Sequence, residues 1–256
     1  MMYLIYILSS LAGGVLVGMA GLTAAMVLTP ILTGACGWND YDAVTMSLVA
    51  NVPSAIITSY TYHKNGNIDR KRGISVALSS FAGAVVGSWL GFLFSQVSEN
   101  GVSYAVIVMN LVLAVKYLKP AKEKKETLTE KEQAKAKKKM LLAMFLGFLI
   151  GVECGFMGSA GGVLMLMVLT LVLGMETKMA VGTSSLVMTL VALTGAVSHL
   201  LMGATLEIVP AVVMTLACTL GAVVSSRFAN KVSDTTMNRA AAIVLILVSV
   251  LSLVLG

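Results

Sequence analysis

Long apolar blocks, separated by short polar connections, follow one another along the whole chain. Most of them contain close to the roughly 20 residues that a membrane-spanning helix needs. The blocks are continuously apolar, whereas the strands of a membrane barrel alternate between apolar and polar residues. A helix also satisfies its own backbone hydrogen bonds in lipid. The pattern therefore predicts an all-α, polytopic membrane protein. Its eight apolar blocks are residues 3–33, 43–62, 74–98, 101–118, 140–173, 179–202, 208–226 and 240–255.

The chain has the pattern of a duplicated sequence. Its only long polar segment, residues 119–139, separates two halves, and segments 83–88 and 221–226 match at an offset of 138 (221 − 83). We therefore expect a first membrane repeat at 1–118, a charged cytoplasmic linker at 119–139 and a second membrane repeat at 140–256. A glycine motif also recurs, at an offset of 137 (151 − 14): Gly14, Gly18 and Gly21 correspond to Gly151, Gly155 and Gly158.

Two of the apolar blocks are too long for a single straight span. Block 140–173 has 34 residues (173 − 140 + 1), about 50 Å of helix against a hydrocarbon core of about 30 Å. If blocks 3–33 and 140–173 turn at their glycines, each forms a helical hairpin that returns to the same face. Each half then has a hairpin plus three spans, which makes the halves inverted repeats. All 18 Lys and Arg residues then lie on one face, as the positive-inside rule requires of a cytoplasmic face. A long tilted span is the alternative.

The glycine-rich turns are the candidate binding site. A helix broken there points the amides of its second arm into the membrane, where they can hold an anion. Helix packing through small residues is the competing explanation. The hydroxyl runs 45–47 and 182–185 follow the two turns and add neutral donors, although such hydroxyls also bond to their own helix. The candidate substrate-binding residues are Gly21, Thr23, Asn51, Gly158, Ser159, Gly161, Gly162, Thr183 and Ser184.

Four polar residues at or near membrane depth, Glu153, Asn51, Asn110 and His199, carry further interpretations. Glu153 is the only one of the 12 Asp and Glu residues well inside a block, which makes it a proton-coupling candidate. The alternative is a protonated, hydrogen-bonded structural carboxyl. Asn51, which is followed by Pro53, indicates either a helix break or a kink. His199 lies near a predicted helix end, where we expect it to snorkel or to cap the helix.

Composition narrows the function classes. With 57% hydrophobic and 12% charged residues, the chain has too little polar surface for a soluble domain. The net charge of +6 comes from basic residues in the connections, so we expect no nucleic-acid partner. The sequence has no nucleophile–base–acid arrangement, no phosphate-binding loop after a strand and no metal-ligand cluster. We therefore expect no enzyme, no cofactor and no metal.

The glycine-rich start of each half, the run Gly182-Thr183-Ser184 and the segment 60–69 together resemble the TauE/SafE sulfite exporter family. The resemblance covers nearly the whole chain. It implies a multi-pass transporter of the bacterial cytoplasmic (inner) membrane, with sulfite, sulfonates and related anions as its substrate class. The first half departs from the glycine-rich pattern at Ala24 and Ala25, where the second half keeps Gly161 and Gly162.

The leading hypothesis is a secondary transporter, in the direction of export, for a small anion bound near mid-membrane between the two repeats. Its partners are then the anionic substrate, the lipid bilayer and a coupled proton or other ion, with a homo-oligomer left open. A passive anion channel is one alternative. A membrane scaffold or assembly factor that binds through residues 119–139 is another. The exact substrate and the coupling ion are not readable from the sequence.

Overall fold

The computed structural model describes residues 2–95, 130–158 and 161–233, with a few isolated positions beyond. All regular elements in these ranges are helical, and six of them (α1, α3, α4, α6, α8 and α9) are long and apolar enough to cross a membrane. The prediction of an all-α polytopic membrane protein is confirmed. Blocks 101–118 and 240–255 lie outside the described ranges. The elements are α1 Met2–Ala20, α2 Ala25–Cys36, α3 Asp40–Lys64, α4 Arg70–Ser95, α6 Glu130–Met157, α7 Gly161–Met167, the π-helical η1 Val168–Val172, α8 Thr177–Leu201 and α9 Ile208–Ala229.

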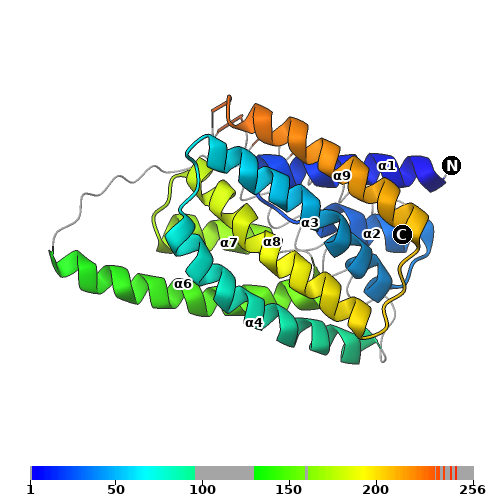
Figure 1. Cartoon of the computed structure of the whole chain (residues 1–256), viewed down its shortest axis with the longest axis horizontal. Helices are drawn as coiled ribbons and strands as arrows, with labels where there is room; N and C mark the ends of the chain where they lie inside the picture. The colour runs from blue at the N-terminus through cyan, green and yellow to red at the C-terminus, as the bar shows by residue number, and fades with distance from the viewer. Residues whose placement is uncertain are drawn as a thin grey trace.

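Two pairs of parallel helices flank the bundle, α1 with α9 and α4 with α6 (Figure 1). In the second pair, Gly83 faces the Phe148 carbonyl and Gly87 faces the Val152 carbonyl, so later residues of α4 meet later residues of α6. A Cβ on either glycine would overlap those backbone atoms. Small residues thus allow direct backbone contact between the two helices.

The repeated glycines form equivalent contacts in the two flanking pairs. Gly14 of α1 faces the Cys218 carbonyl of α9, and its counterpart Gly151 of α6 faces the Ser80 carbonyl of α4. The hairpin of each half therefore packs against a helix of the other half. This exchange ties the two halves into one bundle, and it explains why glycine recurs at these positions.

The first apolar block folds into a hairpin. α1 ends at Gly21, whose φ of 63° is left-handed backbone that favours glycine. The Gly21–Ala24 linker then leads into α2. Trp38, just after α2, donates a hydrogen bond from Nε1 to the hydroxyl of Tyr6 near the start of α1, at 3.3 Å. The chain has therefore returned to the end of the bundle at which α1 began.

The second long block does the same. α6 ends at Gly158, where φ is 71° and the amide donates to the Cys154 carbonyl at 2.8 Å. After α7 and η1, the Leu173 carbonyl accepts from Arg72 Nη1 at 3.4 Å. Arg72 is near the start of α4, which runs parallel to α6, so the chain is back at the end where α6 entered the bundle. The single-span alternative is therefore wrong for both blocks.

α3 and α8, of 25 residues each, cross the centre of the bundle antiparallel to one another (Figure 1). Thr45 of α3 contacts His199 of α8, whereas Gly182 of α8 lies against Tyr62 at the other end of α3. Asn39 caps α3 by accepting the Asp42 amide at 2.8 Å. α3 is continuous through Pro53, so the proposed helix break near Asn51 is wrong.

The two ends of the bundle carry opposite charge. At one end, called the basic end, Asn67 Nδ2 and Lys178 Nζ both donate to Asn230, at 2.9 and 3.3 Å. Residues 64–72, 173–178 and 227–231 of this end contribute basic side chains. At the opposite, acidic end, Asp42 accepts from the Thr205 amide at 2.8 Å. Asp40 and Glu207 belong to this end, at the starts of α3 and α9.

Candidate functional site

The two hairpin linkers meet inside the bundle, at a place we call the linker junction. A Cβ built on Gly162 would lie 2.6 Å from the Leu22 Cα and 2.7 Å from the Gly21 carbonyl oxygen. A Cβ on Gly158 would lie 3.4 Å from the Ala25 Cβ. Later residues of one segment thus face earlier residues of the other, so the segments run antiparallel. Only glycine at position 162 permits this approach.

Ser184 links the two hairpins at the junction. Its hydroxyl lies 3.2 Å from the Gly21 carbonyl and 3.2 Å from the Gly162 carbonyl, and the side chain is fully buried. A serine hydroxyl has one proton, so it donates to one carbonyl at a time or shares the proton between them. The structure therefore places Ser184 beside both Gly21 and Gly162.

Asn51 brings a neutral amide to the same region. Its Oδ1 accepts the Ala24 amide at 2.9 Å, which fixes the orientation of the side chain. The side chain is fully buried, and its Nδ2 has no hydrogen-bond partner within the described residues. A buried donor without a partner is uncommon and indicates a ligand or water site. Its N–H groups suit an anion.

The other predicted site residues differ in position. Thr23 is fully buried within the first linker, and Gly161 faces Cys154 at the start of α7. Thr183 turns away from the junction, because its hydroxyl accepts the Asp69 amide at 3.0 Å just before α4. Ser159 lies outside the described residues. The structure thus brings most of the predicted residues together and separates Thr183 from them.

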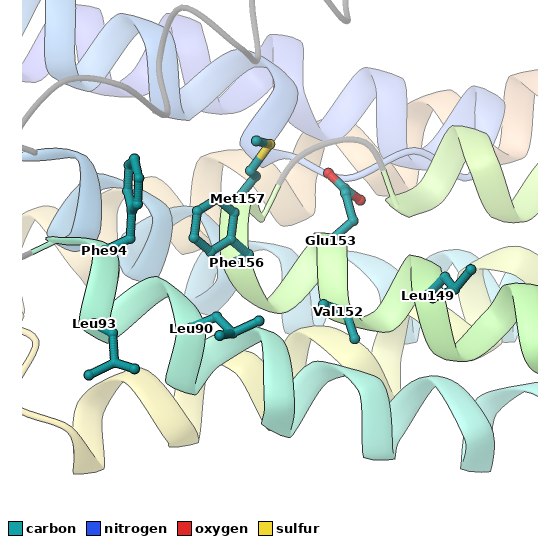
Figure 2. Close-up of a pocket in the computed structure, with 8 residues that line it drawn as sticks. All are labelled: Leu90, Leu93, Phe94, Leu149, Val152, Glu153, Phe156 and Met157. Carbon is teal, nitrogen blue, oxygen red and sulfur yellow. The ribbon is translucent and has the colours of Figure 1, made fainter.

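Glu153 lies on α6, where it borders an open groove of about 650 Å³ between α4 and α6. The groove is otherwise lined by apolar side chains such as Leu90 and Leu149, and both are exposed. Figure 2 shows the Glu153 carboxylate directed away from α4, whereas Val152 points toward it. Glu153 is half-buried. It is the only charged residue of the groove.

The sequence interpretation missed a matching pair of contacts. His199 is fully buried, so the expectation that it snorkels is wrong, and it caps the C-terminal end of α6 rather than of its own helix. Its Nε2 donates to the Gly155 carbonyl of α6 at 2.8 Å. In the other half, the Tyr62 hydroxyl donates to the Gly18 carbonyl of α1 at 3.3 Å. The offset of 137 relates both the donors (199 − 62) and the acceptors (155 − 18), and this offset was the signal available in the sequence.

The fold and the linker junction define a polytopic helical membrane protein in which two broken helices meet inside the bundle, as in membrane transporters. The sequence model of the sulfite exporter TauE/SafE family matches residues 6–252, and the chain belongs to this family of membrane transporters. The chain is also 25% identical over 219 residues to the probable membrane transporter protein YunE of Bacillus subtilis strain 168, which covers 79% of this chain and 80% of that protein. No solved structure matches it significantly.

Proposed function

We propose that this protein is a secondary transporter that exports a small anion of the sulfite or organosulfonate class. The anion binds at the linker junction, between Gly21, Thr23 and Asn51 on one side and Gly158, Gly161, Gly162 and Ser184 on the other. Thr183 acts from the neighbouring turn, where it positions the start of α4. Substrate recognition rests on neutral donors, which hold an oxyanion without binding it too tightly to release.

The Asn51 amide is the observation that carries the proposal. Its Oδ1 is used by the Ala24 amide, and its fully buried Nδ2 has no partner in the described part of the chain. The side chain is therefore fixed with its N–H groups available beside the unwound linker. In a dry interior an unpaired amide is costly, and an anion that accepts from it removes that cost.

The antiparallel linkers and the exchanged hairpins support an inverted-repeat arrangement of the two halves. In this arrangement a site at the pseudo-twofold axis is reached alternately from either face as the halves rock against each other. The basic end is assigned to the cytoplasm by the positive-inside rule, together with the charged segment 119–139. The acidic end then faces outward.

Export of an anion is favoured by a membrane potential that is negative inside, by about 2.3 kcal/mol per charge per 100 mV. A coupled proton is a second energy source. The hypothesis that Glu153 carries it stays a prediction, and the position of Glu153 beside an apolar groove is compatible with either a proton carrier or a neutral structural carboxyl.

A thermal-shift assay on the purified protein tests the site. Sulfite, thiosulfate and methanesulfonate are compared with sulfate and acetate, because a ligand that binds only the folded state raises its stability. We expect Asn51→Asp to keep the acceptor for the Ala24 amide and to abolish the shift, since a carboxylate replaces the donor. Ser54→Ala is the matched control, because Ser54 bonds to the Ala50 carbonyl of its own helix and to the Cys218 thiol of α9, and not to the linkers. An Asn51→Asp protein with a wild-type ligand shift would remove Asn51 from the site.

A further inference from the structure

His199 is held between two helices of different halves. On one side, its Nε2 lies 2.8 Å from the Gly155 carbonyl of α6. On the other side, its Nδ1 lies 3.0 Å from the Thr45 hydroxyl of α3. That hydroxyl lies 2.7 Å from the Tyr41 carbonyl, one turn earlier in α3. Both ring nitrogens are therefore engaged, and the ring is fully buried.

The hydrogen atoms in this chain of contacts can be counted. A carbonyl only accepts, so His199 Nε2 must carry a proton to bond Gly155. In the neutral ring Nδ1 is then an acceptor. Thr45 must donate to it, which takes the hydroxyl proton away from the Tyr41 carbonyl. In the imidazolium both nitrogens donate, Thr45 donates to Tyr41, and all three contacts are satisfied at once. The Thr45 hydroxyl can therefore bond to the ring in either state, as a donor to the neutral ring or as an acceptor from the imidazolium, while the Tyr41 carbonyl keeps the backbone amide of its own helix.

An aromatic ring completes the surroundings. Tyr41 stacks on the His199 ring with centroids 4.5 Å apart and an interplanar angle of 16°. Aromatic faces attract cations, so the Tyr41 ring can stabilise an imidazolium at this position. Rotation of the Thr45 hydroxyl is the adjustment between the two forms of the ring.

Several elements bring titratable groups to the acidic end of the bundle, where His199 lies. α4, α7 and η1 bring none there within the described residues. The hydroxyl of Tyr41 lies 3.5 Å from the His199 carbonyl. Asp42 already accepts from Thr205. The titratable groups on elements around this end are Asp40, Tyr41 and Asp42 of α3, Glu153 and Cys154 of α6, Tyr3 and Tyr6 of α1, Cys36 of α2, and Glu207 before α9.

We infer that His199 is a proton-binding site inside the bundle and that it binds the proton coupled to transport. The proton enters at Nδ1 from the acidic end, and the Thr45 O–H bond turns from Nδ1 to the Tyr41 carbonyl. The Gly155 contact becomes a charge-assisted hydrogen bond, which holds the second hairpin three residues before its turn at Gly158. Loss of the proton weakens the hydrogen bond between His199 and Gly155. The coupling role rests on the proposed transport function.

The other half provides an internal comparison. Tyr62 occupies the position equivalent to His199 and donates to the equivalent carbonyl, of Gly18. A tyrosine hydroxyl makes this bond without taking up a proton near neutral pH. Each hairpin is therefore held by a hydrogen bond to a glycine carbonyl, but only the bond from His199 responds to protonation. Of these two equivalent contacts, only the one made by His199 binds a proton.

Nuclear magnetic resonance of the imidazole nitrogens tests the proton site without any substrate. The chain has only two histidines, so a His63→Gln background leaves the His199 ring as the single imidazole signal. We expect His199 to convert from its neutral to its imidazolium form on acidification. Thr45→Val, which removes the Nδ1 acceptor, is expected to move that conversion to lower pH. A ring that stays neutral throughout, or an unchanged titration in Thr45→Val, overturns the proposal.

Transport in proteoliposomes tests the coupling. For one coupled proton, a gradient of about one pH unit sustains about tenfold accumulation. His199→Gln keeps a neutral donor for Gly155, so we expect it to lose the gradient-driven accumulation of labelled sulfite while it retains sulfite exchange. Tyr62→Phe is the matched control and should keep the response to the gradient. Wild-type accumulation in His199→Gln would overturn the coupling role. Absence of sulfite flux in the wild type would contradict the proposed function for sulfite, while the magnetic resonance result still decides the proton site.

Discussion

Tyr62 and His199 lie 137 positions apart in the chain (199 − 62), and each donates a hydrogen bond to a glycine carbonyl in the first arm of a hairpin. The bond from Tyr62 to Gly18 is 3.3 Å long, and that from His199 to Gly155 is 2.8 Å. Each donor lies near the C-terminal end of a central helix, α3 or α8. The two hairpins are therefore fastened to the central pair at equivalent points, as expected if one half is an inverted copy of the other.

Removal of the Tyr62 hydroxyl should destabilise the first hairpin. Tyr62→Phe loses the donor to Gly18 but keeps the fully buried ring. We expect a loss of about 1 kcal/mol in the free energy of unfolding, which is the typical value for one intramolecular hydrogen bond. Thermal unfolding in detergent measures it. Tyr60→Phe is the control, because Tyr60 is 60% exposed. Equal melting temperatures for the two variants would contradict a fastening role.

The helices and hairpins could be predicted from the sequence because they depend on local properties. The length of block 140–173 and its central glycines are enough to indicate a turn, and Gly158 provides the left-handed backbone there. The direction in which each polar side chain points could not be predicted. Thr183 and Ser184 are neighbours in sequence, but successive residues of a helix point about 100° apart. One therefore reaches Asp69 and the other reaches the junction.

The burial of His199 could not be predicted from its local sequence either. A histidine two residues before the end of α8 is expected to reach the polar surface. It is buried instead because Gly155 of another helix leaves a close approach and an accepting carbonyl beside it. That partner lies 44 residues away in the chain. Only comparison of the two halves, which pairs His199 with Tyr62, contains a sequence signal for this contact.

The positions of the basic loops predict the result of cysteine labelling. Asn67 and Lys178 both contact Asn230, next to Lys231. In a background without Cys36, Cys154 and Cys218, single cysteines at positions 67, 130, 178 and 231 should all be shielded from an impermeant external thiol reagent. A cysteine at the exposed Glu207 of the acidic end is the positive control and should react. External labelling at 178 and 231, with none at 67, would contradict the common face.

The linker junction should tolerate a methyl group at one glycine and not at its neighbour. A Cβ on Gly162 meets the backbone of Leu22 at 2.6 Å, which cannot move without separating the linkers. A Cβ on Gly161 meets the Cys154 side chain, with Cβ at 2.9 Å and Sγ at 3.1 Å. We therefore expect Gly162→Ala to lose the sulfite-induced thermal shift and Gly161→Ala to retain most of it. The reverse order, or identical ligand shifts, would place the site elsewhere.

The roles of Glu153 and His199 can be distinguished by comparing their glutamine variants in one assay. Both residues lie near Gly155, one on its own helix and one through the 2.8 Å hydrogen bond. If His199 binds the coupled proton, Glu153→Gln should keep pH-driven sulfite accumulation and His199→Gln should lose it. The same proteoliposome assay measures both. Loss of the response in Glu153→Gln alone would assign the proton to Glu153, in line with the hypothesis drawn from the sequence.

The central claim is that a small anion is carried through the linker junction, and counterflow tests it most directly. Proteoliposomes loaded with unlabelled sulfite should take up labelled sulfite transiently and saturably when they contain the wild-type protein or Ser54→Ala. Asn51→Asp should reduce the uptake to that of protein-free liposomes. Uptake that rises linearly with the external sulfite concentration and does not depend on the internal sulfite would indicate a channel. Undiminished saturable uptake in a folded Asn51→Asp protein would contradict transport through this junction.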